Sequence, residues 1–349
     1  MNPLVPIVLP PLGALYGAIT RARLSLYRNG TFRTVGLERP VISVGNITTG
    51  GTGKTPLVEW VARVLAADGN KVCILTRGYG RNNPDRRVLV SDGKAVFATA
   101  AEAGDEAFLL ATNLKGIAAV ISDVNRVSAG EGAIKHLNAE CFVLDDGFQH
   151  LRIARDLNIV TVDATNPWGG GNLLPYGRLR EPLSSLRRAD CIVITRANQV
   201  EKIQPLLEEL AQLTGGRPMF RSHMQTIRLA SLMGSSPTEM KTQRSAAFCA
   251  VGNPHSFFDH LRREGLELLL EKVFPDHHTY TQKDIDSLIH AAVKAGAEEL
   301  ITTAKDGVKL QSLEFVIPCY VLEIEISIED EEKLHALIRK AMLLRREDS

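Results

Sequence analysis

A glycine-rich segment that ends in a Lys-Thr pair has the residue types of a phosphate-binding loop. It occupies residues 45–55, reads Gly-Asn-Ile-Thr-Thr-Gly-Gly-Thr-Gly-Lys-Thr, and follows the β-rich run 40–44. A backbone that curls around a polyphosphate needs glycines where side chains would keep its N–H groups away. The residues expected to contact the nucleotide are Thr48, Thr49, Gly50, Gly51, Thr52, Gly53, Lys54 and Thr55. Lys54 would reach the terminal phosphates, and the Thr55 hydroxyl would take one position on a magnesium ion.

The segment after this loop predicts an amphipathic helix, which is the context that a phosphate-binding loop requires. Pro56 lies in the first turn, apolar residues recur at helical spacing from 57 to 65, and Gly69 ends the helix. The usual pattern, Gly-x-x-x-x-Gly-Lys-Ser/Thr, has glycine where this chain has Thr48. The alternative is an ordinary glycine-rich turn before a helix. The flanking strand and helix favour nucleotide binding.

Two adjacent acidic residues, Asp145 and Asp146, follow the apolar run 141–144. A carboxylate at the end of a buried strand beside a phosphate loop can hold magnesium directly or through water. A single acid in this place could be a helix cap. The pair favours a metal site.

Two further charged residues lie where predicted strands or helices begin or end. Arg77 belongs to the segment 76–81, directly after the predicted strand 71–75, where arginines are well placed to meet phosphates. Asp105 lies in a Gly-Asp-Glu sequence before the helical run 107–114. Since an acidic first turn stabilises a helix, the residues alone favour a helix-capping role for Asp105.

Composition limits the classes of partner. The chain has 349 residues, of which 44% are hydrophobic and 5% aromatic, with 41 Lys+Arg against 40 Asp+Glu. Without a basic excess or many aromatic platforms, no nucleic-acid partner is expected, and no obligate protein partner is implied. The five cysteines are far apart and mostly lie in apolar runs, which indicates buried thiols rather than disulfides or a metal site.

Strand-like and helix-like segments alternate along the chain, which predicts an α/β fold with a doubly wound, mostly parallel sheet of the P-loop NTPase type. The predicted strands are 40–44, 71–75, 141–144, 157–162, 191–195, 246–251, 266–273, 299–303 and 319–326. The predicted helices are 56–68, 107–114, 200–213, 257–264, 282–295 and 328–344, with a small hairpin at 87–97. The Gly/Pro-rich loop 163–182 has a length typical of functional or disordered loops.

The N-terminal segment predicts an amphipathic helix that is too short to span a bilayer. Residues 4–19 are almost wholly apolar but include three prolines, whereas spanning takes about 20 residues. No signal-peptide cleavage site stands out. A helix over 11–28 would gather on one face Leu12, Leu15, Tyr16, Ile19, Ala22, Leu26 and Tyr27. This pattern fits a membrane-surface helix and a terminal helix docked on its own domain equally well.

Nine short motifs in order resemble the series found in the tetraacyldisaccharide 4′-kinases (LpxK). They are residues 45–56, Arg-Gly-Tyr-Gly at 77–80, Gly-Asp-Glu at 104–106, Asp-Asp-Gly-Phe-Gln-His at 145–150, Leu-Leu-Pro at 173–175, Leu-Arg-Glu-Pro at 179–182, Gly-Asn-Pro at 252–254, Phe-Pro-Asp-His at 274–277 and Lys-Asp at 305–306. The match spans nearly the whole chain. It implies an ATP- and Mg2+-dependent kinase that phosphorylates the 4′-hydroxyl of a tetraacylated glucosamine disaccharide 1-phosphate in lipid A biosynthesis.

The resemblance also implies roles for individual residues. Those matching the family's nucleotide and metal positions are Lys54, Thr55, Asp145 and Asp146, with Gln149 and Glu181 as further candidate metal ligands. Asp105 and His277 match a pair proposed to act together as the catalytic base. We also expect Arg77 or Arg126 to supply positive charge to the transferring phosphate. Ala107, Gly170 and Arg178 depart from the residues common in the family, which affects local loop shape.

The resemblance gives the predicted domains their roles. Gly-Gly-Arg-Pro at 215–218 and the polar stretch 235–245 mark the junction. We expect a membrane-associating segment at 1–28, a nucleotide-binding kinase domain at 29–222, a linker at 223–244, and a smaller C-terminal α/β domain at 245–349 that closes the cleft. A lipid substrate implies a peripheral position on the cytoplasmic face of the inner membrane.

Three other classes of protein share a phosphate-binding loop. A GTPase is disfavoured because the chain has no Asn-Lys-x-Asp sequence to read guanine. An ATPase that positions partners at membranes usually has lysine where this chain has Thr49. A soluble small-molecule kinase remains open on the residues alone.

Overall fold

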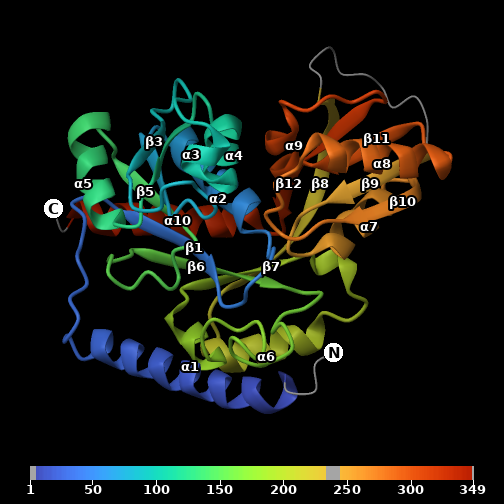
Figure 1. Ribbon diagram of the computed structural model, residues 1–349. Helices are drawn as coiled ribbons and strands as arrows, with labels where there is room; N and C mark the ends of the chain where they lie inside the picture. Colours follow the sequence, from blue (N-terminus) through green and yellow to red (C-terminus); the bar gives the residue numbers. More distant parts are fainter. Residues whose placement is uncertain (1–4, 233–243, 348–349) are drawn as a thin grey trace.

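The computed structural model describes residues 5–232 and 244–347, and these build one twelve-stranded sheet flanked by helices (Figure 1). The strands are β1 (Val41–Asn46), β2 (Val72–Thr76), β3 (Val88–Ser91), β4 (Ala118–Ser122), β5 (Cys141–Asp145), β6 (Leu157–Asp163), β7 (Cys191–Thr195), β8 (Met219–Ser231), β9 (Arg244–Cys249), β10 (Glu267–Val273), β11 (Glu299–Thr303) and β12 (Cys319–Ile328). The helices are α1 (Val5–Arg28), α2 (Lys54–Ala67), α3 (Ala100–Ala103), α4 (Asp105–Asn113), α5 (Arg126–Leu137), α6 (Gln204–Thr214), α7 (Pro254–Arg263), α8 (Gln282–Lys294), α9 (Ala304–Leu310) and α10 (Glu331–Glu347), with 3-10 turns η1 (Leu183–Arg188) and η2 (Ala197–Gln199).

The strand order is β10-β9-β11-β12-β8-β7-β6-β1-β5-β2-β4-β3. The neighbours β7, β6, β1, β5, β2 and β4 are parallel to one another. Every residue of β1, β2, β4, β5 and β7 is buried, because helices cover both faces of this part of the sheet. The predicted α/β class with a mostly parallel sheet is thus confirmed.

The sheet register brings the predicted phosphate loop and the acidic pair together. In the parallel pair β1 and β5, Val44 lies beside Asp145. On the other side of β1, Asn46 lies beside Thr161 of β6. Since the carboxyl ends of parallel strands share one edge, the loop after β1 and the acids after β5 meet there.

The predicted linker at 223–244 is wrong for its first part. Residues 219–221 of β8 pair with β7, and residues 222–231 continue the same strand as the antiparallel neighbour of β12. One 13-residue strand therefore joins the two halves of the sheet directly. The polar stretch that suggested the junction lies mainly in 233–243, outside the described residues, and the end of the predicted linker, Arg244, begins β9.

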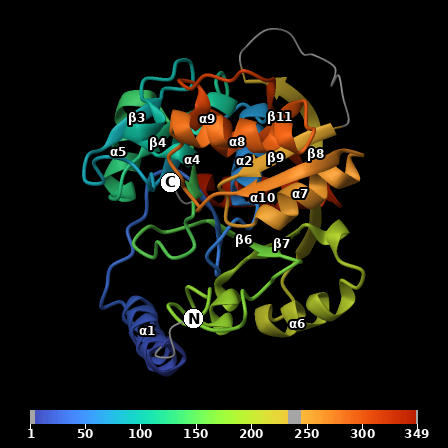
Figure 2. The same ribbon diagram turned by 45° about the vertical axis from the view of Figure 1, so that its right-hand side comes forward.

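The C-terminal helix also crosses the predicted domain boundary. Leu334, Ile338 and Met342 of α10 are buried in the same core cluster as α2. On the surface, the Arg339 guanidinium donates to the Asp68 carboxylate at the end of α2, at 2.7 Å. In Figure 1 α10 runs behind α2 in the N-terminal half of the chain, away from α7 and α8, and in the turned view of Figure 2 the C-terminal elements α7 and α8 stand in front of it.

Smaller differences from the sequence predictions concern short elements. The expected hairpin at 87–97 has a single strand, β3, which pairs antiparallel with β4, and Ser91 bridges Val96. The expected helix 200–213 begins later, as α6 at Gln204. β4, α5 and α9 had no predicted counterpart. The expected helix over 11–28 extends further toward the N-terminus, as α1.

Candidate active site

The loop between β1 and α2 has the backbone that phosphate binding requires. Gly50 and Gly53 have φ angles of 112° and 76°, a left-handed conformation that side chains rarely adopt. A Cβ atom on Gly53 would also lie 3.0 Å from the Met224 methyl carbon. α2 begins directly at Lys54, so its free N–H groups face the loop.

Two of the predicted nucleotide contacts, Thr48 and Thr52, are buried within the loop's own packing. The Thr52 hydroxyl accepts from Asn46 Nδ2 at 2.8 Å and lies 3.0 Å from the Thr161 hydroxyl. Thr48 is 5% exposed and bridges to Leu179 of the Gly/Pro-rich loop. Thr48 thus anchors the loop where the usual pattern has glycine.

The acidic pair combines one raised and one lowered pKa. Burial, together with the charges of Glu106 and Asp146, raises the pKa of Asp145 to about 6, although Thr76 Oγ1 donates to its carboxylate at 2.7 Å. Burial also acts to raise the pKa of Asp146, but Lys54 and Arg180 outweigh it and hold that pKa well below the usual range. Lys54 Nζ lies 3.5 Å and Arg180 Nη1 2.7 Å from the Asp146 carboxylate.

The residues around the acidic pair supply oxygen atoms of the kind that magnesium prefers. Gln149 Oε1 is buried without a partner, while its Nε2 donates to the Asn46 carbonyl at 2.8 Å. Glu181 is 2% exposed, and its carboxylate forms an ion pair with Arg188. Among the described residues, no three His, Cys, Asp or Glu side chains form a metal cluster. The donors fit an ion that is held mainly by hydroxyl, carboxylate and phosphate oxygens.

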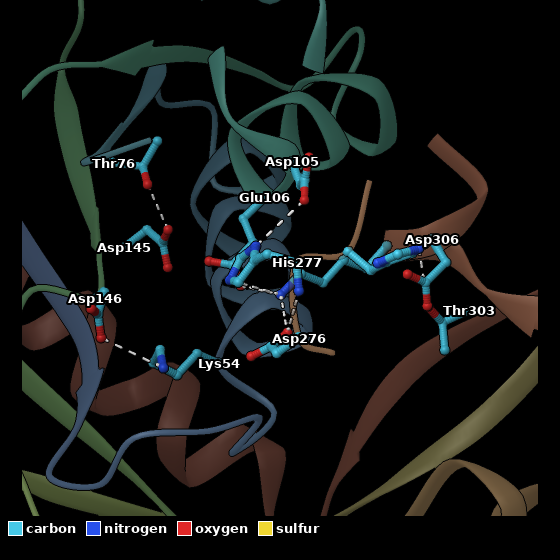
Figure 3. Close-up of polar contacts among 12 residues, drawn as sticks. Lys54, Thr76, Asp105, Glu106, Asp145, Asp146, Asp276, His277, Thr303 and Asp306 are labelled. Carbon is cyan, nitrogen blue, oxygen red and sulfur yellow. Dashed lines mark hydrogen bonds and ion pairs between the residues drawn. The ribbon is translucent and has the colours of Figure 1, made fainter. Parts of the chain in front are cut away.

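Asp105 and His277 meet across the two halves of the chain. His277 Nδ1 lies 3.4 Å from Asp105 Oδ2, although the residues are 172 positions apart (Figure 3). Asp105 is the first residue of α4, and the cap position is occupied by Gly104, so Asp105 itself does not cap the helix. His277 lies in the loop before α8 with a left-handed φ of 61°. The Asp105 carboxylate thus turns toward His277.

Two lysines of α9 complete this cluster, and sequence reasoning missed both. Lys309 Nζ lies 3.5 Å from Asp105 Oδ2, and Lys305 Nζ lies 3.4 Å from His277 Nε2. Burial acts to raise the pKa of Asp105, but His277 and then Lys309 outweigh it and lower that pKa. The only available signal was the Lys-Asp motif at 305–306, which spacing alone does not connect to His277.

The two predicted phosphate-binding arginines occupy different environments. Arg77 is exposed, and its guanidinium lies 5.2 Å from the centre of the Tyr79 ring. Arg126 is 3% exposed and donates to the Asp146 carbonyl at 3.4 Å. Both line the same cavity of about 1570 Å³ as Lys54, Asp146 and His277.

A further arginine, Arg196, links the phosphate loop to the C-terminal half. Its Nη2 donates to the Gly51 carbonyl at 2.8 Å, and its Nε donates to the Ser256 hydroxyl of α7 at 2.5 Å. Its Nη1 forms a buried ion pair with Asp163 at the end of β6. A Cβ atom on Gly252 would lie 2.7 Å from the Gly51 nitrogen, so the segment before α7 packs directly on the loop.

Comparison with known proteins finds one family along nearly the whole chain. The model of the family LpxK, tetraacyldisaccharide-1-P 4′-kinase, matches residues 5–343. The tetraacyldisaccharide 4′-kinase of Geobacter sulfurreducens is 42% identical over 335 residues, which cover 94% of this chain and 91% of that protein. The Geobacter metallireducens enzyme of the same name is 41% identical and covers 98% of this chain and 100% of its own length. The crystal structure of Aquifex aeolicus LpxK in complex with ATP superposes with a TM-score of 0.75 at 32% identity, covering 95% of this chain and 98% of that chain.

Proposed function

The chain belongs to the LpxK family of tetraacyldisaccharide-1-P 4′-kinases, and we propose that it transfers the γ-phosphate of ATP to the 4′-hydroxyl of a tetraacylated glucosamine disaccharide 1-phosphate. The product would enter lipid A biosynthesis. The observation that carries this proposal is the cavity itself. The phosphate loop and Asp146 line one side of it, and His277, which lies beside the Asp105 carboxylate, reaches it from the other half of the chain.

The loop and its neighbours would hold ATP. Backbone N–H groups of Gly50, Gly51 and Gly53 would surround the phosphates, and Lys54 would exchange Asp146 for a phosphate oxygen. Thr55, Asp145, Asp146 and Gln149 have the oxygen donors for magnesium, and Glu181 would contribute after leaving Arg188. A bound magnesium ion would neutralise charge on the phosphate oxygens during transfer.

The Asp105–His277 pair would activate the acceptor. His277 would take the proton of the 4′-hydroxyl while that oxygen forms its bond to the γ-phosphorus and the bond to ADP breaks. Asp105 would hold the ring and stabilise its protonated form. Arg126, buried beside Asp146, or Arg77 would place a positive charge on the transferring group.

The exposed face of α1 supports a peripheral position at the membrane. α1 docks through small residues, since Gly13 and Gly17 are buried against the Gly/Pro-rich loop. The larger apolar residues point away from the protein, with Leu15 57% and Ile19 59% exposed. No described helix is long and apolar enough to cross a bilayer. An apolar face of this kind suits insertion into the surface of the cytoplasmic leaflet, where both the lipid and ATP are accessible.

The direct test uses purified protein, magnesium-ATP and the tetraacylated disaccharide 1-phosphate in detergent micelles. We expect phosphate transfer to the 4′-hydroxyl, identified by mass spectrometry and NMR of the product, and no comparable transfer to soluble glucosamine or its phosphates. Equal phosphorylation of a soluble sugar would instead favour a small-molecule kinase. Lys54→Ala, assayed in parallel, excludes a contaminating kinase.

A further inference from the structure

The fold fixes Lys305 beside the ring of His277. α9 begins after Thr303, whose side chain caps the helix by accepting from the Asp306 backbone nitrogen. The Asp306 carboxylate is fully buried and accepts from the Ala250 nitrogen after β9 at 2.9 Å. Gly307 lets α9 approach β12, because a Cβ there would lie 2.7 Å from a Val321 methyl group. Lys305 therefore extends from a rigidly anchored turn.

The Lys305 ammonium has three partners in the site. It lies 3.2 Å from Glu106 Oε1, 3.4 Å from Asp276 Oδ1 and 3.4 Å from His277 Nε2. The Lys305 side chain is only 17% exposed. Two carboxylates from α4 and from the loop before α8 thus neutralise its charge, and the third contact is with the imidazole.

This contact decides which ring nitrogen carries the proton. A lysine ammonium has donors only, so His277 Nε2 must accept from Lys305. The proton of the neutral ring then sits on Nδ1, where it faces Asp105 Oδ2 at 3.4 Å. The nitrogen with the free electron pair, which a general base needs, is therefore the one beside Lys305.

We propose that Lys305 keeps His277 neutral and occupies its proton-accepting nitrogen until the substrate hydroxyl takes that place. This inference rests on the proposed role of His277 as the base. Asp105 on one side of the ring favours the charged imidazolium, and Lys305 on the other side opposes it. Asp276, which directly precedes His277 in the same loop, pairs with Lys305, while Lys309 faces Asp105. Lys305 is a positioning residue, since it acts through His277.

Replacing Lys305 by the substrate hydroxyl at His277 Nε2 would not leave the lysine charge unpaired. When the 4′-hydroxyl arrives at Nε2, the Lys305 ammonium still has Glu106 and Asp276 as partners. It also lines the cavity that would hold the phosphates. The hydroxyl proton then moves to Nε2 as the oxygen–phosphorus bond forms, and the resulting imidazolium is stabilised by Asp105.

The first test follows the ring itself, without substrate. The intact protein is labelled at histidine, His277→Gln identifies the signal, and the ring is titrated by NMR in the wild type, Lys305→Met, Lys305→Arg and Lys333→Met. Lys333 is a matched control, because it pairs with Asp330 on the surface and its loss changes net charge equally. In Lys305→Met we expect the ring to become protonated about one pH unit higher than in the wild type, since a nearby positive charge is gone. Lys305→Arg and Lys333→Met should resemble the wild type.

The second test measures kcat/KM against pH with the lipid substrate. Lys305→Met should move the acid limb of the profile to higher pH by the same amount. On that limb its kcat/KM should fall about tenfold, with a smaller loss at high pH. A loss that is equal at every pH, or an unmoved His277 signal, would overturn the inference, as would Lys305→Arg behaving like Lys305→Met. The NMR result does not depend on which substrate the enzyme accepts, so it stands apart from a failure of the proposed function.

Discussion

At the scale of single residues, Lys54 has the most direct predicted role. Its ammonium pairs with Asp146 at 3.5 Å in this structure. When ATP binds, the ammonium would pair with the ATP phosphates instead. Losing one such charge from a transferring phosphoryl group typically costs about 100-fold or more in rate. We expect Lys54→Ala to lose kinase activity by that factor while its circular dichroism spectrum and melting temperature remain near those of the wild type. A near-normal rate would contradict the assignment of the loop.

Asp105 and His277 are predicted to act as one unit. Groups that act together give losses that do not add, so removing the second costs little after the first is gone. The double variant Asp105→Ala/His277→Ala should therefore have a kcat close to that of the worse single variant. Losses that multiply would mean independent roles, with Asp105 acting mainly in the first turn of α4.

A third prediction at this scale concerns His150, which follows Gln149. Burial, and after it the charges of Arg126 and Arg155, lowers the pKa of His150 to about 3. Between pH 6.5 and 3 the unfolded chain binds a proton that the folded chain does not. The free energy of unfolding therefore decreases as the pH is lowered through this range, by up to about 1.4 kcal/mol per pH unit.

His150→Gln should remove this contribution, so its stability should decline less steeply below pH 6.5 than that of the wild type. Urea unfolding between pH 7 and 5 measures the difference. His290→Gln, at an exposed position of α8, is the matched control. Parallel stability curves for His150→Gln and the wild type would show that His150 does not set the slope.

At the scale of helices and strands, α1 carries the prediction for membrane binding. Its exposed face offers Leu12, Leu15 and Ile19, while Gly17 faces the protein, where a Cβ atom would lie 2.6 Å from a Leu173 methyl group. Substituting Leu12 and Leu15 by serine should release much of the protein from anionic vesicles without loss of ATP binding. Each arginine near an anionic membrane surface contributes about 1 kcal/mol to membrane binding, and salt screens this attraction. Binding should therefore weaken further as the salt concentration rises.

The matched control for α1 is the pair Leu343 and Leu344 of α10, which are 59% and 55% exposed. Their substitution by serine should leave vesicle flotation unchanged. Deleting residues 1–28 should have at least the effect of the Leu12/Leu15 variant. If the truncated chain floats as fully as the intact one, α1 is a packing element and another surface meets the membrane.

The predictability of each element follows from how local its signal is. The run at 141–144 is wholly apolar and the run at 191–195 is apolar up to Thr195, so β5 and β7 were predicted nearly at their true bounds. β8 has mixed burial, because its first residues lie in the core beside β7 and the remainder pairs with β12. Its sequence therefore resembles a linker. α9 is a seven-residue helix whose polar residues serve the site, and it has no apolar stripe.

The site was predicted unevenly for the same reason. The phosphate loop and the acidic pair are local motifs, and their residue types imply their chemistry. Asp105 and His277 could be paired only through the family resemblance, because 172 residues separate them. Lys305, Lys309 and Arg196 act through partners on distant elements, and no spacing along the chain records those contacts.

At the scale of the whole molecule, Arg196 is where the two halves of the sheet meet the phosphate loop. The three groups that it binds belong to the loop, to β6 and to α7. Its side chain is 10% exposed and that of Asp163 6%, so this ion pair is largely removed from water. Removing one partner of a buried pair leaves the other charge uncompensated, which typically costs about 3–5 kcal/mol.

Arg196→Ala should therefore lower the free energy of unfolding by roughly 3 kcal/mol and raise the KM for ATP, since the Gly51 carbonyl loses its donor. Asp163→Asn in the same chain should recover part of the stability, because no buried charge is then left unpaired, but it should not restore the KM. Arg228→Ala is the control: Arg228 pairs with Glu323 on the surface, where water screens the charges, and its loss should change stability little. Urea unfolding and ATP titration of the four proteins separate the two effects. If Arg196→Ala is as stable as Arg228→Ala, the packing of Gly252 on the loop, and not the arginine, holds the halves together.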